Sequence, residues 1–282
     1  ISGRTEATGR GVKFALKAFF QNDNDVKKTG LTPGLKGKRI IVQGLGNVGY
    51  YAAKFLSDED GAKVTHVIER DGSIVNHKGI DISSLKKHLI VKGTIKGFNG
   101  FIEAGAEILE EEADILIPAA MELVINEENA NRIKVPLIVE AANGPVSSSA
   151  DDILNKRGVI IIPDLYANAG GVTVSYFEWI KNLSRIRLGR LQRRAQENQV
   201  SALISGIERM TGKEFPSEFK SKSIQGLSEL DLVRSGLEDT MIETYNIISN
   251  VWNSNENIPD LRTAAMMVSI KRIAQSYGSL GI

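Results

Sequence analysis

Three glycines, Gly44, Gly46 and Gly49, are spaced G-x-G-x-x-G within KRIIVQGLGNVGYYAAKFLS, residues 38–57. An apolar run precedes them and a helix-forming segment follows. This order predicts a strand, a tight turn and a helix whose first N–H groups can bind an anion. Gly44 would permit the turn, Gly46 would let the backbone approach a pyrophosphate, and Gly49 would let helix and strand pack closely. The pattern is typical of a dinucleotide-binding loop, although a glycine turn without a ligand has the same letters.

An acidic residue, Glu69, follows Gly49 by 20 positions, at the end of the second predicted strand. A carboxylate at this place accepts hydrogen bonds from ribose hydroxyls, each worth about 1.5–3 kcal/mol, and repels a 2′-phosphate. Arg70 has the opposite tendency, because arginine can pair with a 2′-phosphate. The N–H groups of Asn47 and Val48 would contact the pyrophosphate. We therefore predict a preference for NAD, with NADP accepted more weakly.

A second informative stretch is PDLYANAGGVTVSYFEW, residues 163–179. If a helix begins at Asn168, then Asn168, Val172 and Ser175 share one face of it. A carboxamide and a hydroxyl would then project in one direction, and two glycines behind Asn168 would leave room for a flat ring near the backbone. An ordinary capped helix with a buried serine explains the same letters equally well.

The elements that must position these residues alternate between strand and helix. Five short β-branched runs occupy residues 39–44, 63–69, 114–120, 136–142 and 159–164. Several of them are apolar throughout, which is typical of parallel strands buried on both faces. Helix-like segments lie between most of them, so the sequence predicts an α/β fold with a Rossmann-like, doubly wound sheet.

Helices dominate the rest of the chain. Further predicted helices cover residues 5–21, 195–211, 229–253 and 260–277, with a loop at 212–228. We predict a dinucleotide-binding domain with a leading helix over residues 1–182, a divergent helical insertion over 183–227 and C-terminal helices over 228–282. The insertion includes an arginine-rich stretch at 185–194, for which a solvated helix face or a subunit contact is favoured over a phosphate-binding patch.

Composition excludes several classes of protein. The formal net charge of +1 argues against a general nucleic-acid binder. No apolar run reaches the ~18 residues of a membrane span. The chain has no cysteine, and its histidines, His66, His77 and His88, are too scattered for a metal site. We therefore expect no metal, no nucleic acid and no membrane among its partners.

Motifs in a fixed order make the resemblance specific. GRTEATGRGV, VQGLGNVG, EAANGP, PDLYANAGGVTVSYFEW and DLRTAA occur here in the order found in glutamate dehydrogenases of the Glu/Leu/Phe/Val amino-acid dehydrogenase superfamily. The likeness covers residues 1–182 and 228–282. VTVSYFEW is typical of the glutamate branch, while a dehydrogenase for a branched or aromatic amino acid is the alternative enzyme. A non-catalytic NAD-binding module is the alternative outside enzymes.

The resemblance implies roles for individual positions. It assigns the nicotinamide carboxamide to Thr8 and Asn168, the pyrophosphate and adenosine to Asn47, Val48 and Glu69, and the cleft lining to Ala119, Ala120 and Asn143. It assigns the substrate carboxylate to Ser175 and places Arg4 near the substrate side. The implied reaction is reversible oxidative deamination of L-glutamate to 2-oxoglutarate and ammonia.

The resemblance also implies what the chain lacks. In this family a Lys of depressed pKa and an Asp carry the catalysis, and both belong to an N-terminal domain. Neither motif occurs here, and Lys36 in GLKGK has the wrong surroundings. We therefore expect a cofactor-binding portion with no catalytic residue, inactive alone. By resemblance the full-length enzyme is a homo-hexamer, cytoplasmic or, as the alternative, of the mitochondrial matrix.

Overall fold

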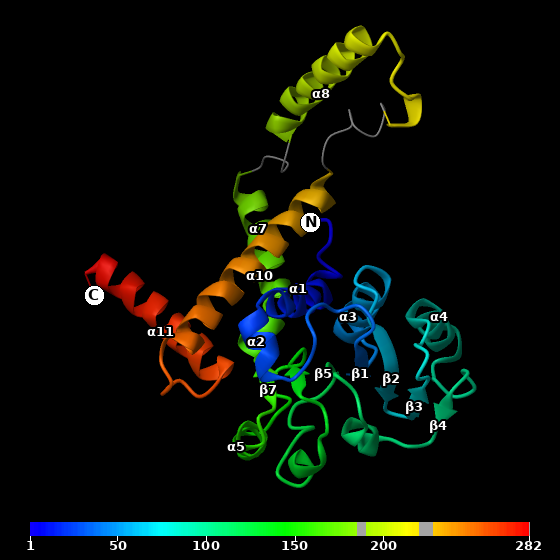
Figure 1. Ribbon diagram of the computed structural model, residues 1–282, viewed down its shortest axis with the longest axis vertical. Helices are drawn as coiled ribbons and strands as arrows, with labels where there is room; N and C mark the ends of the chain where they lie inside the picture. The colour runs from blue at the N-terminus through cyan, green and yellow to red at the C-terminus, as the bar shows by residue number, and fades with distance from the viewer. Residues whose placement is uncertain (185–189, 220–227, 282) are drawn as a thin grey trace. The chain divides into compact units, whose positions relative to one another are not determined.

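The computed structural model describes residues 1–184, 190–219 and 228–281 (Figure 1). The chain divides into two compact units. The larger comprises Thr5–Gly171 and Glu238–Ile282, and the smaller comprises Ile1–Arg4 and Val172–Leu237. The predicted insertion at 183–227 and its arginine-rich stretch lie partly outside the described residues. The three-part division made from the sequence stays a prediction.

The strands are β1 (Arg39–Gln43), β2 (Lys63–Glu69), β3 (Gly72–Val75), β4 (Phe101–Ile102), β5 (Ile115–Pro118), β6 (Leu137–Val139) and β7 (Ile160–Ile162). The described helices are α1 (Ala7–Gln21), α2 (Asp23–Lys28), α3 (Asn47–Asp58), α4 (Ile82–Lys92), α5 (Ser148–Lys156), α6 (Asp164–Ala167), α7 (Gly170–Ser184), α8 (Arg190–Thr211), α10 (Glu229–Ser254) and α11 (Leu261–Leu280). Two 3₁₀ turns, η1 (Ala106–Glu110) and η2 (Ala130–Arg132), complete them.

All seven strands form one sheet in the order β4-β3-β2-β1-β5-β6-β7. Strands β2, β1, β5, β6 and β7 run parallel, which confirms the five predicted strands and the doubly wound α/β fold. The antiparallel strands β3 and β4 at one edge were not predicted, because four and two residues are too short to carry a pattern. The chain winds outward from β1 through β2 and, in the other direction, from β5 to β7. The carboxyl ends of β1 and β5 therefore form the topological switch point, where ligands of such sheets bind.

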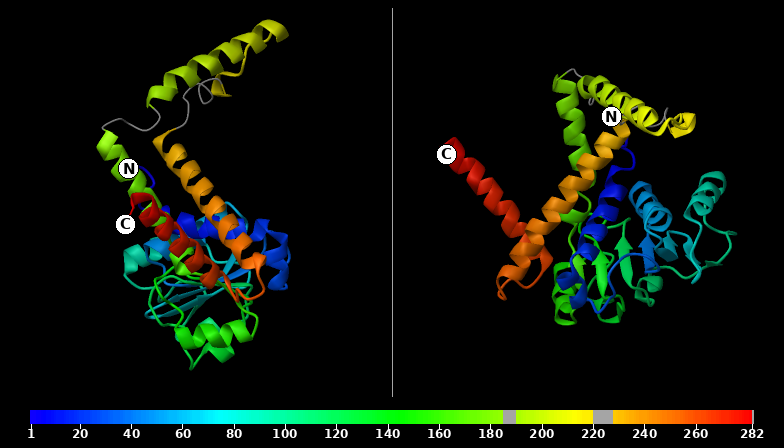
Figure 2. Two further views of the ribbon diagram at one scale, coloured as in Figure 1. Left: turned by 90° about the vertical axis from the view of Figure 1, so that its left-hand side faces the viewer. Right: turned by 45° about the horizontal axis from the view of Figure 1, so that its top comes forward.

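Side chains of the parallel strands are buried on both faces of the sheet. One face carries Ile41, Ile68, Leu116, Ile138 and Ile161, which pack with side chains of α5, η1 and η2. The alternate positions carry Ile40, Val42, Ile115, Ile117, Leu137, Val139, Ile160 and Ile162, all buried. Figure 1 shows α1 and α3 on one side of the sheet and α5 on the other, and Figure 2 shows the same layers in a view turned by 90°. Because both faces are covered, the strands read as continuous apolar runs.

Polar contacts connect the first residues of the smaller unit to its helices. The backbone nitrogen of Ile1 lies 2.8 Å from Glu178 Oε1. Glu229 accepts from the backbone N–H of Ser2 at 2.9 Å and from Lys181 Nζ at 2.7 Å. These contacts tie residues 1–4 to α7 and to the start of α10.

The described residues contain neither a bilayer-spanning helix nor a cluster of metal ligands. No helix there is both long enough and apolar enough to cross a bilayer. No group of three or more His, Cys, Asp or Glu side chains there is arranged to hold a metal ion.

Candidate dinucleotide-binding site

The glycine loop joins β1 to α3, and two of its glycines are required by close packing. Gly44 has φ 90°, and a Cβ added to it would lie 2.5 Å from Ala120 Cβ. A Cβ on Gly49 would lie 1.9 Å from the Gly44 carbonyl oxygen. Gly46 differs, because a Cβ on it would meet nothing within 4 Å, so the space at the start of α3 is open. Gly46 is also the N-cap of α3, whose first N–H groups belong to Asn47 and Val48.

The peptide groups of Leu45 are held from two sides. The carboxylate of Glu69, at the end of β2, accepts a hydrogen bond from the Leu45 N–H. Lys86 Nζ, from α4, donates to the Leu45 carbonyl oxygen at 2.8 Å. The Gly44 N–H donates to the Ile68 carbonyl at 2.7 Å. The loop is therefore fixed to β2 and to α4.

A cleft of about 860 Å³ opens at the carboxyl ends of β1, β2 and β5. Its lining includes Gly44, Glu69, Arg70, Ala120 and Leu123. Ala119 and Ala120 follow β5, and their N–H groups donate to the Gln43 main-chain and side-chain oxygens at 2.8 and 3.3 Å. Leu123 is the one non-glycine residue with positive φ, 53°, among the described residues. Such backbone conformations concentrate at ligand sites, and this one lies in the cleft.

Two asparagine side chains meet beside β6 and β7. Asn168 Nδ2 donates to Asn143 Oδ1 at 2.7 Å. Among the described residues, Asn168 Oδ1 and Asn143 Nδ2 make no further hydrogen bond, which leaves one acceptor and one donor side by side. No helix begins at Asn168, which is the C-cap of α6, and α7 begins at Gly170; the condition stated for a shared helix face is therefore not met. The short helix α6 was missed because it has only four residues.

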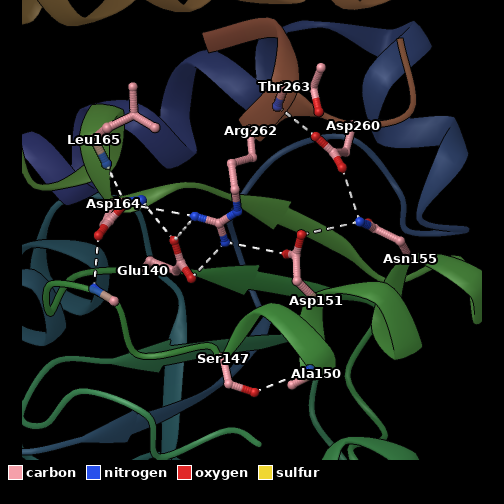
Figure 3. Close-up of polar contacts among 11 residues, drawn as sticks. Glu140, Ser147, Ala150, Asp151, Asn155, Asp164, Leu165, Asp260, Arg262 and Thr263 are labelled. Carbon is pink, nitrogen blue, oxygen red and sulfur yellow. Dashed lines mark hydrogen bonds and ion pairs between the residues drawn. The ribbon is translucent and has the colours of Figure 1, made fainter. Parts of the chain in front are cut away.

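An ion-pair network centres on Arg262 of α11 (Figure 3). Glu140, directly after β6, is fully buried and binds Arg262 of α11 through both carboxylate oxygens, at 2.8 and 3.0 Å. Arg262 also contacts Asp151 at 3.3 Å and Asp164 at 3.7 Å. Burial raises the pKa of Glu140 above its usual value, and Arg262 opposes that shift.

Thr8, predicted to contact the carboxamide, sits at a close junction of three helices. Gly9 lies against α3, where a Cβ would approach Tyr51 Cβ to 2.6 Å and the Val48 carbonyl to 2.8 Å. On Gly11 a Cβ would lie 2.9 Å from Gly170 Cα. The half-buried Thr8 is therefore placed between the start of α3 and the start of α7.

The structure brings most of the predicted cofactor residues together in the larger unit. Gly44, Glu69, Arg70 and Ala120 line the cleft at the switch point, and Asn143 pairs with Asn168. Gly46, Asn47, Val48 and Gly49 form the end of the glycine loop and the start of α3, and Ala119 directly follows β5. Arg70 is exposed beside Glu69 in the β2–β3 turn. Ser175 and Arg4 belong to the smaller unit, so their relation to the cleft stays a prediction.

Sequence reasoning missed Lys86 and Arg262, although both anchor the site. Lys86 lies 41 positions from Leu45, and Arg262 lies 122 positions from Glu140. No local pattern marks contacts of this range. Arg262 does belong to the family motif DLRTAA, and that motif could have marked it as a candidate.

Comparison with known proteins identifies the family. The family profile of glutamate/leucine/phenylalanine/valine dehydrogenases matches residues 1–213. The chain belongs to this dehydrogenase family. A probable glutamate dehydrogenase of Sinorhizobium fredii is 48% identical over 97% of this chain and 62% of its own length. The mitochondrial glutamate dehydrogenase of Dictyostelium discoideum is 47% identical over 100% of this chain and 56% of its own length.

Solved structures of dehydrogenases from this family share the fold. Glutamate dehydrogenase from Peptoniphilus asaccharolyticus matches with a TM-score of 0.67 and 27% identity, over 99% of this chain and 54% of that one. The hetero-hexameric glutamate dehydrogenase from Thermus thermophilus, in a Leu-bound form, matches with a TM-score of 0.75 at 23% identity over 100% and 55%. The resemblance inferred from the motifs is confirmed, and the chain spans about three fifths of the length of the curated relatives it matches.

Proposed function

We propose that this chain is the cofactor-binding portion of a glutamate dehydrogenase and that its cleft binds NAD(H), with NADP(H) accepted more weakly. The reaction of the whole protein would be reversible oxidative deamination of L-glutamate to 2-oxoglutarate and ammonia. Family membership and the glutamate dehydrogenase relatives support the reaction class. When bound, the nicotinamide would supply the hydride acceptor.

The single observation that carries the cofactor proposal is the open space at Gly46. Its neighbours Gly44 and Gly49 are packed so tightly that each has no room for a Cβ, whereas Gly46 faces nothing within 4 Å. The N-terminus of the 12-residue helix α3 lies at this position, with N–H groups that have no partner within the helix. A pyrophosphate fits this combination of space, donors and positive helix dipole.

The adenosine end would be read by Glu69. Its Oε1 accepts from Leu45, so Oε2 remains for a ribose hydroxyl. A 2′-phosphate would meet this carboxylate first, while the exposed Arg70 offsets part of the repulsion. This balance supports a preference for NAD that is not strict.

The nicotinamide end would be read by the asparagine pair. A primary carboxamide has one strong acceptor and two donors. Asn143 Nδ2 and Asn168 Oδ1 offer the complementary donor and acceptor. Thr8 at the neighbouring helix junction would add a hydroxyl, as the resemblance implies.

The proposal also covers substrate binding and catalysis, for which the support is the family resemblance. Ser175 would bind the substrate carboxylate and Arg4 would lie on the substrate side, both by resemblance. This chain has neither the Lys nor the Asp motif of the family, so we infer that it binds cofactor alone without turnover. The homo-hexamer is proposed by resemblance alone. The location is proposed as cytoplasmic or, as the alternative, the mitochondrial matrix, and the mitochondrial relative supports the alternative.

Calorimetry with NADH on the 282-residue chain tests the cofactor proposal. Gly46→Ala is the informative variant, because its Cβ would meet no described residue within 4 Å and would enter the space assigned to the pyrophosphate. We expect an unchanged thermal midpoint and an NADH affinity lower by about 10-fold or more, or ~1.4 kcal/mol. Wild-type protein that releases no heat with millimolar NADH, or a Gly46→Ala variant with wild-type affinity, would refute the proposal.

A further inference from the structure

Arg262 occupies the second position of α11 and lies among three carboxylates (Figure 3). Its two terminal nitrogens donate to the two oxygens of Glu140, a bidentate geometry that fixes both side chains. Glu140 is fully buried, and a buried carboxylate without a partner is strongly unfavourable. Arg262 therefore determines where the Glu140 carboxylate lies.

Glu140 in turn holds Asp164. The Asp164 N–H donates to Glu140 Oε2 at 2.8 Å, at the first residue of α6. Asp164 also makes hydrogen bonds to the two backbone segments that contain Asn143 and Asn168. Its Oδ2 accepts from the Gly144 N–H at 2.8 Å, next to Asn143, and its carbonyl accepts from the Asn168 N–H at 3.1 Å.

A continuous chain of contacts thus runs from α11 to the asparagine pair. The contacts lead from Arg262 to Glu140 and Asp164, and from there to Gly144 and Asn168. The side chain of Asn143 is exposed and that of Asn168 is only partly buried, so packing alone does not fix them. Their 2.7 Å hydrogen bond forms only while the two backbone segments keep their spacing.

We propose that Arg262 and Glu140 are positioning residues for the nicotinamide end of the cofactor site. They touch no part of the cofactor themselves. They hold residues 143–144 and 164–168 at the spacing that lets Asn143 and Asn168 present one donor and one acceptor to a carboxamide. This inference rests on the proposed NAD(H) binding, and it adds one residue of the last helix, Arg262, to the supports of the site.

The test compares two ligands on the full chain. NADH carries the carboxamide, whereas ADP-ribose has the adenosine, pyrophosphate and both riboses but no nicotinamide. In Arg262→Met we expect NADH affinity to fall by about 10-fold, as for loss of one or two hydrogen bonds, while ADP-ribose affinity stays within about 2-fold. Arg262→Lys, which keeps the charge without the fork, should lie between Arg262→Met and wild type. Arg272→Met, an exposed arginine of the same helix, is the matched control.

A double variant separates the effect of Arg262 on NADH affinity from its effect on thermal stability. Arg262→Met alone leaves Glu140 buried without its cation and lowers the thermal midpoint. Glu140→Met with Arg262→Met removes both charges and should recover much of that midpoint, yet it still lacks the contact to Asp164. We expect it to keep the selective loss of NADH affinity, and it serves as the test if Arg262→Met does not fold.

The outcomes distinguish the inference from the proposed function. Equal loss of NADH and ADP-ribose, or no loss of NADH affinity in a folded double variant, overturns the positioning role and leaves NAD(H) binding intact. Wild-type protein that binds neither ligand overturns NAD(H) binding, and the positioning role with it.

Discussion

Leu45 shows how single residues prepare the glycine loop for a ligand. Glu69 accepts its N–H, and Lys86 donates to its carbonyl, so the peptides on both sides of Leu45 are oriented before any cofactor binds. A loop fixed in advance does not lose conformational entropy on binding, which preserves affinity. The same arrangement leaves Glu69 one free oxygen among the described residues for recognition of a ribose.

The charge of Glu69 can be tested apart from its hydrogen bond. Glu69→Gln keeps an oxygen that can accept from Leu45 but removes the negative charge. We expect NADH affinity to fall and NADPH affinity to rise, so that the ratio between them changes by about 10-fold or more. Parallel titrations of the two cofactors at constant salt measure this ratio. Arg70→Gln, which should weaken NADPH alone, is the companion variant.

His66 predicts a pH dependence of stability. Its ring is buried in β2, with Nδ1 2.9 Å from Thr65 Oγ1 and with the His77 ring 5.5 Å away. Burial, and then the charge of His77, lower the pKa of His66. The unfolded chain therefore binds a proton that the folded chain rejects, so stability is full above the unfolded pKa of about 6.5 and declines as the pH falls below it.

Thermal midpoints between pH 8 and 5 measure this effect, over a range of about 1.5 units on either side of that pKa. We expect the midpoint of His66→Gln to fall less steeply with decreasing pH than that of wild type. His88→Gln is the control, because His88 is only half-buried and belongs to α4 rather than to the sheet. Curves of equal slope for His66→Gln and wild type would show that His66 is not the group responsible.

At the scale of elements, glycine contacts set the distances between helices. Gly9 lets α1 approach α3, and Gly11 lets it approach the start of α7 at Gly170. A Cβ on Gly170 would in turn lie 2.5 Å from the Ala7 carbonyl. These contacts place Thr8 beside the first turns of two helices whose N–H groups and glycines form the proposed site.

Gly11→Ala tests this junction. In an exposed helix, Gly→Ala stabilises by up to about 1 kcal/mol. At Gly11 the new Cβ would meet Gly170 Cα at 2.9 Å, so the helices must separate, and we expect a net loss of about 1–3 kcal/mol in the free energy of unfolding. Gly206→Ala in α8, where a Cβ meets nothing within 4 Å, is the matched control and should be neutral or stabilising. Denaturant titrations measure both variants, and equal effects would contradict the packing argument.

At the scale of the molecule, the last helix carries an exposed apolar stripe. Its members recur every three or four positions and are all exposed: Met266, Ile270, Ile273, Tyr277 and Leu280. Such a stripe is typical of a helix that packs against another part of a protein. The curated relatives are longer than this chain.

Catalytic turnover depends on the whole enzyme, so the prediction at the scale of the molecule concerns activity. We expect the 282-residue chain to bind NADH and to show no steady-state reduction of NAD with L-glutamate above a blank without protein. The physical reason is that the proton transfers of the reaction need a positioned base, which the resemblance assigns to the Lys and Asp of another domain. A rate that scales with protein concentration, and that survives in a repurified sample, would contradict this prediction.

Much of the fold could be predicted from the sequence, and so could the candidate site residues that lie close together along the chain, because their signals are local. The buried parallel strands β1, β2, β5, β6 and β7 are short β-branched runs, several of them apolar throughout, so all five could be recognised. The glycine loop and Glu69 were recognised because the turn, the helix start and the acidic residue are separated by short, fixed lengths of chain. The family motifs indicated Thr8, Asn143 and Asn168 as site residues without showing that the two asparagines touch.

Only the tertiary structure decided which distant residues meet. Lys86 reaches Leu45, Arg262 reaches Glu140, and Gly11 touches Gly170, and no spacing along the chain encodes these contacts. The short helix α6, which precedes α7, is likewise held by long-range contacts. Its first residue, Asp164, makes hydrogen bonds to Glu140 and Gly144 as well as to Asn168 at its end. The reason is physical: local propensity and periodicity follow from neighbouring residues, whereas the pairing of a buried charge or a bare glycine is selected by the partner that folding brings to it.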